Sequence, residues 1–121
     1  MRTVFFRLII AIAVIGLFSL YSNSVHAQTL VSDQADYMAG TTVTLNGTGF
    51  LENEQVIIDV NHVDGSQAEN FYYSPFSVFA DASGNILATW QVPTDGTADG
   101  ASLVAIATGS SSGFEAFAYF T

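Results

Sequence analysis

The chain has 121 residues, half of them apolar, and it carries 11 acidic side chains against two basic ones. Both basic residues, Arg2 and Arg7, lie near the N-terminus, so no Lys or Arg follows position 7. This distribution excludes phosphate-neutralising nucleic-acid binding and a basic membrane-surface patch, because both require Lys or Arg. The chain also has no cysteine, which excludes disulfide bonds, a thiol nucleophile and a zinc–thiolate site.

Residues 1–27 have the layout of a secretory signal peptide. The basic segment 1–7 precedes an apolar run at 8–20, and a polar stretch then ends in Val25-His26-Ala27, with small or β-branched residues at the −3 and −1 positions. A membrane anchor is the alternative, but 13 apolar residues fall short of the roughly 20 that span a bilayer. We therefore predict cleavage after Ala27, a secreted or cell-surface location through a Sec-type signal, and no membrane association afterwards.

After cleavage, residues 28–121 would form one strongly acidic domain. All 11 carboxylates fall in this part of the chain, and it contains no Lys or Arg with which they could form salt bridges. A strong net charge of one sign favours solubility. We therefore expect the stability of the domain to come from the burial of apolar side chains and from backbone hydrogen bonds.

Alternation of apolar and polar residues with a period of two recurs through residues 28–121, and it predicts β-strands. Val56, Ile58 and Val60, for example, share one face of such a strand. Residues 61–70 are predicted to form a polar loop. The predicted strands are 28–37, 42–50, 55–60, 71–80, 86–92, 103–107 and 114–120.

Seven short strands in fewer than 100 residues are typical of an antiparallel β-sandwich. We therefore predict an all-β domain at 28–121, with a small closed barrel as the structural alternative. Nine glycines in this region, together with its Thr, Val and aromatic residues, disfavour a helical bundle. The large side chains predicted for the core are Phe76, Trp90, Phe114 and Phe120.

Two aromatic residues are predicted on the outside of the last strand. Alternation places Phe117 and Tyr119 on the face opposite Phe114 and Phe120. Large apolar side chains on such a face either form an exposed adhesive stripe or are covered by a neighbouring module of the same chain.

One stretch of the sequence resembles a known family. Residues 37–50 read Tyr-Met-Ala-Gly-Thr-Thr-Val-Thr-Leu-Asn-Gly-Thr-Gly-Phe, and Glu54-Gln55-Val56 follows. This resembles the opening of immunoglobulin-like repeats in large bacterial secreted and cell-surface proteins, although Ala39 and Glu52-Asn53 replace the usual Pro and Pro-Gly. Residues 107–121 are similar to the closing hairpin of these repeats. The resemblance implies a seven-stranded immunoglobulin-like sandwich with an adhesive or spacing role outside the cell, often in tandem and without catalysis.

The sequence offers little for catalysis. His62 is the single histidine after residue 27, and a Ser-His-Asp hydrolase would recruit it together with Asp64. The segment 109–113 does not have the strand-turn-helix context of a nucleophile elbow. We therefore predict that His62 is a solvated loop residue and that the protein is not an enzyme.

A carbohydrate-binding module is the alternative function. Tyr72 and Tyr73, with Trp90 as a further member, could stack on sugar rings if they were exposed on the sandwich. The competing interpretation is that Phe71 and Tyr73 are buried in the core and that Tyr72 packs at a sheet edge. The binding partner is accordingly predicted to be a protein or a glycan surface.

A calcium site is the last candidate. In immunoglobulin strand order, the first-to-second, third-to-fourth and fifth-to-sixth connections meet at one pole of the sandwich. No Lys or Arg neutralises the carboxylates of these connections, and Ca²⁺ prefers such oxygen ligands in flexible loops. An ordinary solvated acidic rim is the alternative. The predicted ligands are Asp36, Asp64, Glu69, Asp95 and Asp99.

Overall fold

The computed structural model describes residues 27–66 and 71–121. The predicted signal peptide, except for Ala27, lies outside these residues, as does Glu69 of the predicted calcium site. None of the helical residues in the described part forms a helix that is long and apolar enough to cross a membrane.

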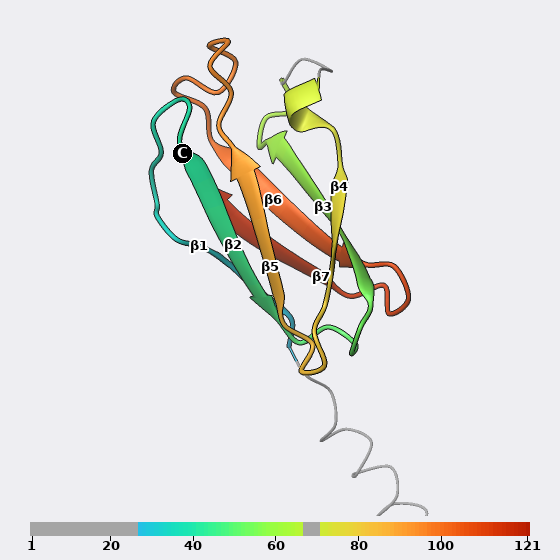
Figure 1. Cartoon of the computed structure of the whole chain (residues 1–121). Helices are drawn as coiled ribbons and strands as arrows, with labels where there is room; N and C mark the ends of the chain where they lie inside the picture. The colour runs from blue at the N-terminus through green and yellow to red at the C-terminus, as the bar shows by residue number, and fades with distance from the viewer. Residues whose placement is uncertain (1–26, 67–70) are drawn as a thin grey trace, which may run out of the picture.

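The described residues form seven strands and one short 3-10 helix, which confirms the predicted all-β class (Figure 1). Most of the strands alternate between buried and exposed positions, as the pattern of the sequence requires. The elements are β1 (Thr29–Ser32), β2 (Thr42–Thr48), β3 (Gln55–His62), η1 (Phe71–Tyr73), β4 (Phe76–Phe79), β5 (Ile86–Gln91), β6 (Leu103–Gly109) and β7 (Glu115–Phe120).

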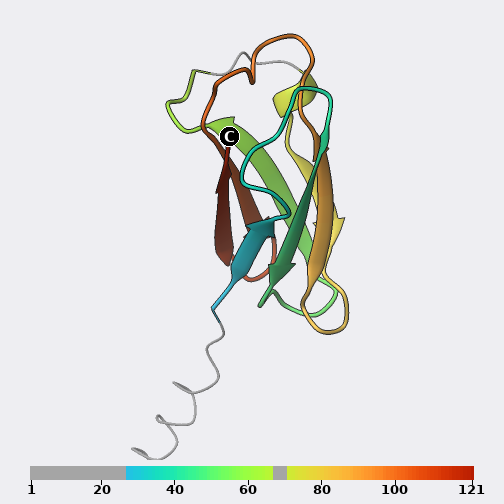
Figure 2. The same cartoon turned by 90° about the vertical axis from the view of Figure 1, so that its left-hand side faces the viewer.

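The strands form two antiparallel sheets that pack face to face as a sandwich, and not a closed barrel (Figure 2). One sheet has the order β1-β2-β5 and the other has the order β4-β3-β6-β7. The β1–β2, β3–β4 and β5–β6 connections lie at the pole where the chain reaches Thr121, and β1 begins at the opposite pole (Figure 1). The predicted meeting of these three connections is therefore confirmed.

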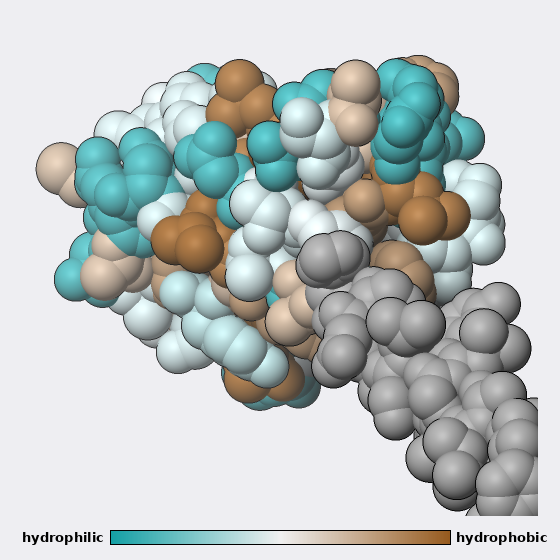
Figure 3. All heavy atoms as spheres, turned by 90° about the horizontal axis from the view of Figure 1, so that it is seen from below, coloured by the Kyte–Doolittle hydropathy of each residue, from teal (hydrophilic) through white to brown (hydrophobic). Residues whose placement is uncertain are grey.

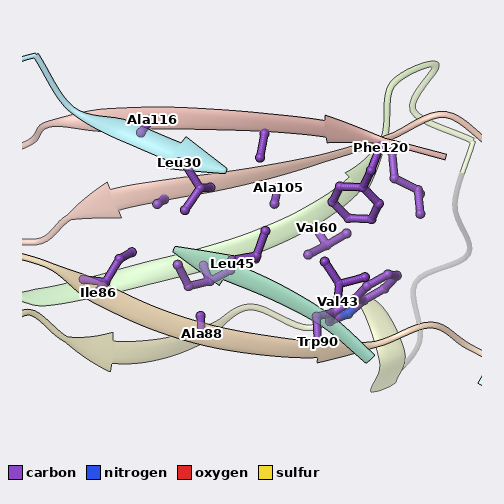
Figure 4. Close-up of a cluster of buried hydrophobic side chains, with 14 of the residues drawn as sticks. Leu30, Val43, Leu45, Val60, Ile86, Ala88, Trp90, Ala105, Ala116 and Phe120 are labelled. Carbon is purple, nitrogen blue, oxygen red and sulfur yellow. The ribbon is translucent and has the colours of Figure 1, made fainter. Parts of the chain in front are cut away.

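The core lies between the two sheets, where inward-pointing side chains of both sheets meet (Figure 4). Val43 and Leu45 of β2 are completely buried, as are Val56 and Ile58 of β3. Trp90 and Phe120 are also buried, as predicted, and Phe76 is partly buried against the same cluster. Seen from the pole at which β1 begins, the apolar residues of the surface form separate patches among polar ones (Figure 3).

The predicted fourth strand at 71–80 is wrong at its beginning. Residues 71–73 form η1 instead, and Ser74 donates its N–H to the carbonyl of Phe71 over 3.3 Å. Pro75 follows, which has no N–H to give to a ladder, so β4 begins only at Phe76. As a result Phe71 is 85% exposed and does not belong to the core.

A second prediction for the core is also wrong. Phe114 is exposed, because it lies in the β6–β7 connection just before β7 begins at Glu115. Gly113 reaches a φ of 72° there, so the chain is still turning when it arrives at Phe114. The core position at the start of β7 belongs to Ala116, which is buried.

Glu54 is a buried carboxylate that the sequence analysis did not single out. It is 4% exposed, and with no Lys or Arg nearby it is satisfied by backbone N–H groups. Its Oε1 accepts hydrogen bonds from Ser112 at 2.6 Å and Ser111 at 3.0 Å, and its Oε2 accepts one from Leu51 at 2.9 Å. The carboxylate thus joins the β2–β3 connection to the β6–β7 connection.

Gly109 makes room for this carboxylate. A Cβ atom at position 109 would lie 2.5 Å from Oε1 of Glu54 and 2.4 Å from Oγ of Ser112. Burial raises the pKa of Glu54, but the hydrogen bonds from Ser112, Leu51 and Ser111 together lower it by more, so the net pKa lies below its ordinary value. Glu54 is therefore held in its charged form by oriented backbone dipoles.

Candidate functional site

His62 is the first candidate, and the structure buries it. It ends β3, and its ring lies edge-on to that of Tyr73, with 5.4 Å between the ring centroids. Nε2 of His62 lies 3.2 Å from the Tyr73 hydroxyl, which in turn lies 2.9 Å from Oγ1 of Thr97. The prediction of a solvated loop histidine is therefore wrong. His62 takes part in a hydrogen-bond network that joins β3, η1 and the β5–β6 connection.

The surroundings of His62 do not have the geometry of a Ser-His-Asp triad. Nδ1 of His62, which binds the carboxylate in a triad, lies 3.1 Å from Oγ of Ser66, and Nε2, which binds the serine in a triad, contacts a tyrosine hydroxyl. The carboxylate of Asp64 instead accepts the N–H of Ser66 over 3.0 Å. Hydrogen bonds from Ser66 hold the pKa of Asp64 below its usual value. Asp64 is thus hydrogen-bonded to its own loop, and His62 interacts with it electrostatically.

An open cavity of about 560 Å³ lies beside His62, at the pole for which the calcium site was predicted. Asp64 and Asp99 line it, while Asp95 accepts the N–H and the hydroxyl of Thr97 at 3.0 and 2.6 Å. Asp36 is engaged elsewhere, with the hydroxyl of Thr121. Within residues 27–66 and 71–121, no three His, Asp or Glu side chains gather closely enough to hold a metal ion. The described residues therefore do not assemble the predicted calcium ligands.

An aromatic groove of about 390 Å³ is the second candidate, between η1 and β5. Tyr72 lies at its wall with Phe71, and the two rings are 5.7 Å apart in an edge-to-face arrangement. The indole Nε1 of Trp90 donates a hydrogen bond to the carbonyl of Tyr72 over 2.8 Å, which fixes η1 against β5. The groove is lined by Phe71, Tyr72, Ser74, Pro75, Phe76, Thr89, Trp90 and Gln91.

The two tyrosines of η1 have different environments. Tyr72 is 38% exposed at the groove, whereas Tyr73 is 6% exposed and packs between His62 and Trp90. Tyr73 is therefore not available to stack on a sugar, and its place beside Tyr72 is taken by Phe71. The Ser74-Pro75 dipeptide in the sequence indicates a turn. A turn at this position interrupts the strand alternation from which the facing of Tyr72 and Tyr73 was predicted.

The outer face of the four-stranded sheet is the third candidate. Phe117 is 47% and Tyr119 is 68% exposed, as predicted. The strand register places Phe117 opposite Ile106 and Tyr119 opposite Val104; the partly exposed Ile106 extends the apolar surface, whereas Val104 is buried. We call these four residues the β6–β7 patch. The sequence pattern alone did not show that β6 would lie beside β7 in this register.

Acidic and polar residues border the β6–β7 patch. Glu115 lies on the same face at the start of β7, since it is two residues from Phe117 in an alternating strand. Asp59 of β3 is paired with Ile106 in the next ladder. The patch is thus a compact apolar surface with carboxylates at its border and no basic side chain among the described residues.

Comparisons with known proteins agree with this architecture. No curated protein matches the sequence. Among solved structures, the chain is similar to macromomycin with a TM-score of 0.58 and 23% identity, over 78% of this chain and 98% of that one. That likeness shows the fold alone. The model of the macroglobulin-like domain, which has an immunoglobulin-like fold, matches residues 25–121. Since the match spans the whole sandwich, the chain belongs to the macroglobulin-like domain family.

Proposed function

We propose that this protein is a non-enzymatic extracellular module for adhesion or structural spacing at a cell surface. The β6–β7 patch is the observation that carries the proposal. Outward positions of a solvated sheet are usually polar, whereas this face presents Phe117 and Tyr119 over the apolar side chains of β6. Aromatic residues are enriched at protein interfaces.

Spacing is supported by the positions of the two ends of the sandwich. The chain enters β1 at one pole and leaves β7 at the other (Figure 1), so neighbouring modules of the same chain could follow one another end to end. Export is supported by the sequence of residues 1–27. Mass spectrometry of the protein recovered from the medium or the cell surface should find a mature N-terminus at Gln28.

The adhesive role is tested by binding of the fluorescently labelled mature chain to intact cells of the source organism. Replacing Phe117 or Tyr119 with Ser should abolish most of the binding. Leu87→Ser is the matched control, because Leu87 is an exposed apolar residue of β5 on the other sheet. Binding that is equally strong for wild type and for Phe117→Ser would contradict the proposal, provided that both unfold at similar temperatures.

Carbohydrate binding is the second candidate function, and the aromatic groove is the observation that favours it. Phe71 and Tyr72 expose their rings there, and an aromatic wall of this kind can stack on a pyranose ring, while the buried Trp90 holds η1 in place through its hydrogen bond to the carbonyl of Tyr72. A glycan array with the wild-type chain and Tyr72→Ala tests this candidate. A glycan signal that is lost in Tyr72→Ala but kept in Phe117→Ser would assign the function to the groove rather than to the β6–β7 patch.

A further inference from the structure

Asp59 is an acidic residue in the interior of a strand. Among the described residues, every other Asp and Glu lies in a connection or at the first position of a strand. Asp59 occupies the middle of β3, which is an inner strand of the sheet β4-β3-β6-β7. Its neighbours Ile58 and Val60 are buried in the core, so alternation directs Asp59 to the outer face of the sheet, where it is partly exposed.

The described residues give the carboxylate of Asp59 no role in holding the fold together. None of them donates a hydrogen bond to it, and none of them is a Lys or an Arg. Its cross-strand partner is Ile106 of β6, and Ile57 precedes it by two residues on the same face of β3. Asp is depleted in strands, where β-branched and aromatic residues are preferred. A residue that conflicts with its local structure in this way points to a function.

The strand register places Asp59 in one row with Ile106 and Phe117. Neighbouring strands are about 4.8 Å apart, so the backbones of β3 and β7 lie about 10 Å from each other, with β6 between them. Ile106 is partly exposed and Phe117 is 47% exposed. The space above Ile106 therefore has a negative charge on one side and an aromatic ring on the other.

This combination of groups matches the chemistry of a guanidinium. A guanidinium is planar and positively charged, forms paired hydrogen bonds with a carboxylate, and stacks on aromatic rings. Placed above Ile106, it would direct N–H groups to Asp59 and lie against the ring of Phe117. A purely apolar partner would instead bury the carboxylate of Asp59 without a hydrogen bond, which costs free energy.

The domain itself cannot supply the guanidinium. No Lys or Arg follows residue 7, and Glu115 adds a second carboxylate at the start of β7 on the same face. Two copies that met through this face would bring carboxylates together without a counter-charge. The guanidinium must therefore come from a different protein.

We infer that the outer face of the sheet β4-β3-β6-β7 binds a partner protein through an exposed Arg side chain of that partner. The Arg pairs with Asp59, covers Ile106 and stacks on Phe117, while Tyr119 contacts the apolar surface around it. Arg is one of the residues that contribute most to protein interfaces. This inference rests on the proposed adhesive function and names the chemistry of the partner.

The probe is N-acetyl-arginine amide, and N-acetyl-citrulline amide is its control, because citrulline has nearly the same shape without the charge. Each is titrated at low salt into the mature chain labelled with ¹⁵N, and binding is followed by NMR. We expect the arginine probe to shift the amide signals of Asp59, Ile106 and Phe117 saturably, and the citrulline probe to leave them unchanged.

Variants of the row test each contact separately. Asp59→Asn keeps the shape of the side chain and should weaken binding of the arginine probe about fivefold, the effect of one partly exposed ion pair. Glu52→Gln is the matched control, because it removes the same charge from an exposed position in the β2–β3 connection and should leave binding unchanged. Phe117→Leu keeps an apolar side chain without the ring and should weaken binding about threefold.

A stability measurement distinguishes a binding role of Asp59 from a structural one. Asp59→Thr should raise the midpoint of thermal unfolding, because a β-branched residue suits an inner strand, while it weakens binding as Asp59→Asn does. A lower midpoint would show that the fold itself uses the carboxylate, which would refute the inference.

Other results would overturn the inference in identifiable ways. Equal weakening by Asp59→Asn and Glu52→Gln would show a response to net charge alone. Equal shifts with the citrulline probe would refute recognition of a guanidinium. Cell binding that is lost in Phe117→Ser but unchanged in Asp59→Asn would refute the inference while the proposed function survives. Saturable arginine binding at Asp59 without any cell binding would support the arginine site and refute the adhesive function.

Discussion

Replacement of Glu54 is the most informative perturbation of this fold. The carboxylate is buried, has no cationic partner, and accepts three backbone N–H groups from two connections that are far apart in sequence. Glu54→Ala leaves these N–H groups without their acceptor. An orphaned buried donor costs about 1–3 kcal/mol. Because water can reach part of the vacated space, we expect a loss of about 3–5 kcal/mol in the free energy of unfolding.

Glu54→Gln should be milder. The amide oxygen can still accept the N–H groups of Ser111 and Ser112, but its NH₂ group then faces the N–H of Leu51. The hydrogen bond from Leu51 is lost, and two N–H donors then face each other. We therefore expect the free energy of unfolding to fall by about 1–3 kcal/mol. Urea-induced unfolding at pH 7, followed by the fluorescence of Trp90, measures both variants. Glu52→Gln is the matched control, because Glu52 is exposed two residues away.

The pH dependence gives an independent test. The pKa of Glu54 is lowered in the folded state, so its contribution to stability is present above the ordinary pKa of 4.5 and is lost as the pH falls through the lower folded value. Glu54→Gln removes this titration, and its deficit relative to wild type should shrink below pH 4.5. A deficit that is constant from pH 7 to pH 3, or a loss under about 1 kcal/mol for Glu54→Ala, would refute this account of the buried carboxylate.

Three further predictions concern the packing around these features. Gly109→Ala should lower the unfolding free energy by about 1–3 kcal/mol, since its Cβ would meet Oε1 of Glu54 at 2.5 Å; thermal unfolding measures this, and an unchanged midpoint would contradict it. Tyr73→Phe should cost about 1–2 kcal/mol in chemical denaturation, because His62 loses its buried hydroxyl partner, and a neutral result would show that the network is not stabilising. Leu45→Ala should cost about 2–5 kcal/mol by the same measurement, because Leu45 is completely buried, whereas Leu87→Ala should cost little.

Local patterns were sufficient to predict most of the strands and the all-β class. Each half-buried strand alternates with a period of two, so Val56, Ile58 and Val60 could be assigned to one face without knowledge of their neighbours. The same rule placed Phe117 and Tyr119 outside. The rule failed at residues 71–75, where the chain turns through η1 and the facing of Phe71 and Tyr73 no longer follows a strand.

The candidate sites depended on contacts between distant segments. The apolar surface beside Phe117 requires β6 in one register, and the groove requires the indole of Trp90 to bind the carbonyl of Tyr72 across 18 positions. Neither contact has a local signature, because partners so far apart are selected by the packing of the whole sandwich.

The sequence by itself determined that any buried carboxylate of the domain must do without a Lys or Arg partner, since none follows residue 7. Only the tertiary structure decided that this carboxylate is Glu54. Eleven acidic residues are chemically similar along the chain, but among those that the structure describes only Glu54 lies where Gly109 leaves room for it and where the N–H groups of Ser111 and Ser112 converge on it. Burying a charge requires several donors aimed at one point, and residues 57 and 58 positions apart are brought to that point only by the complete fold.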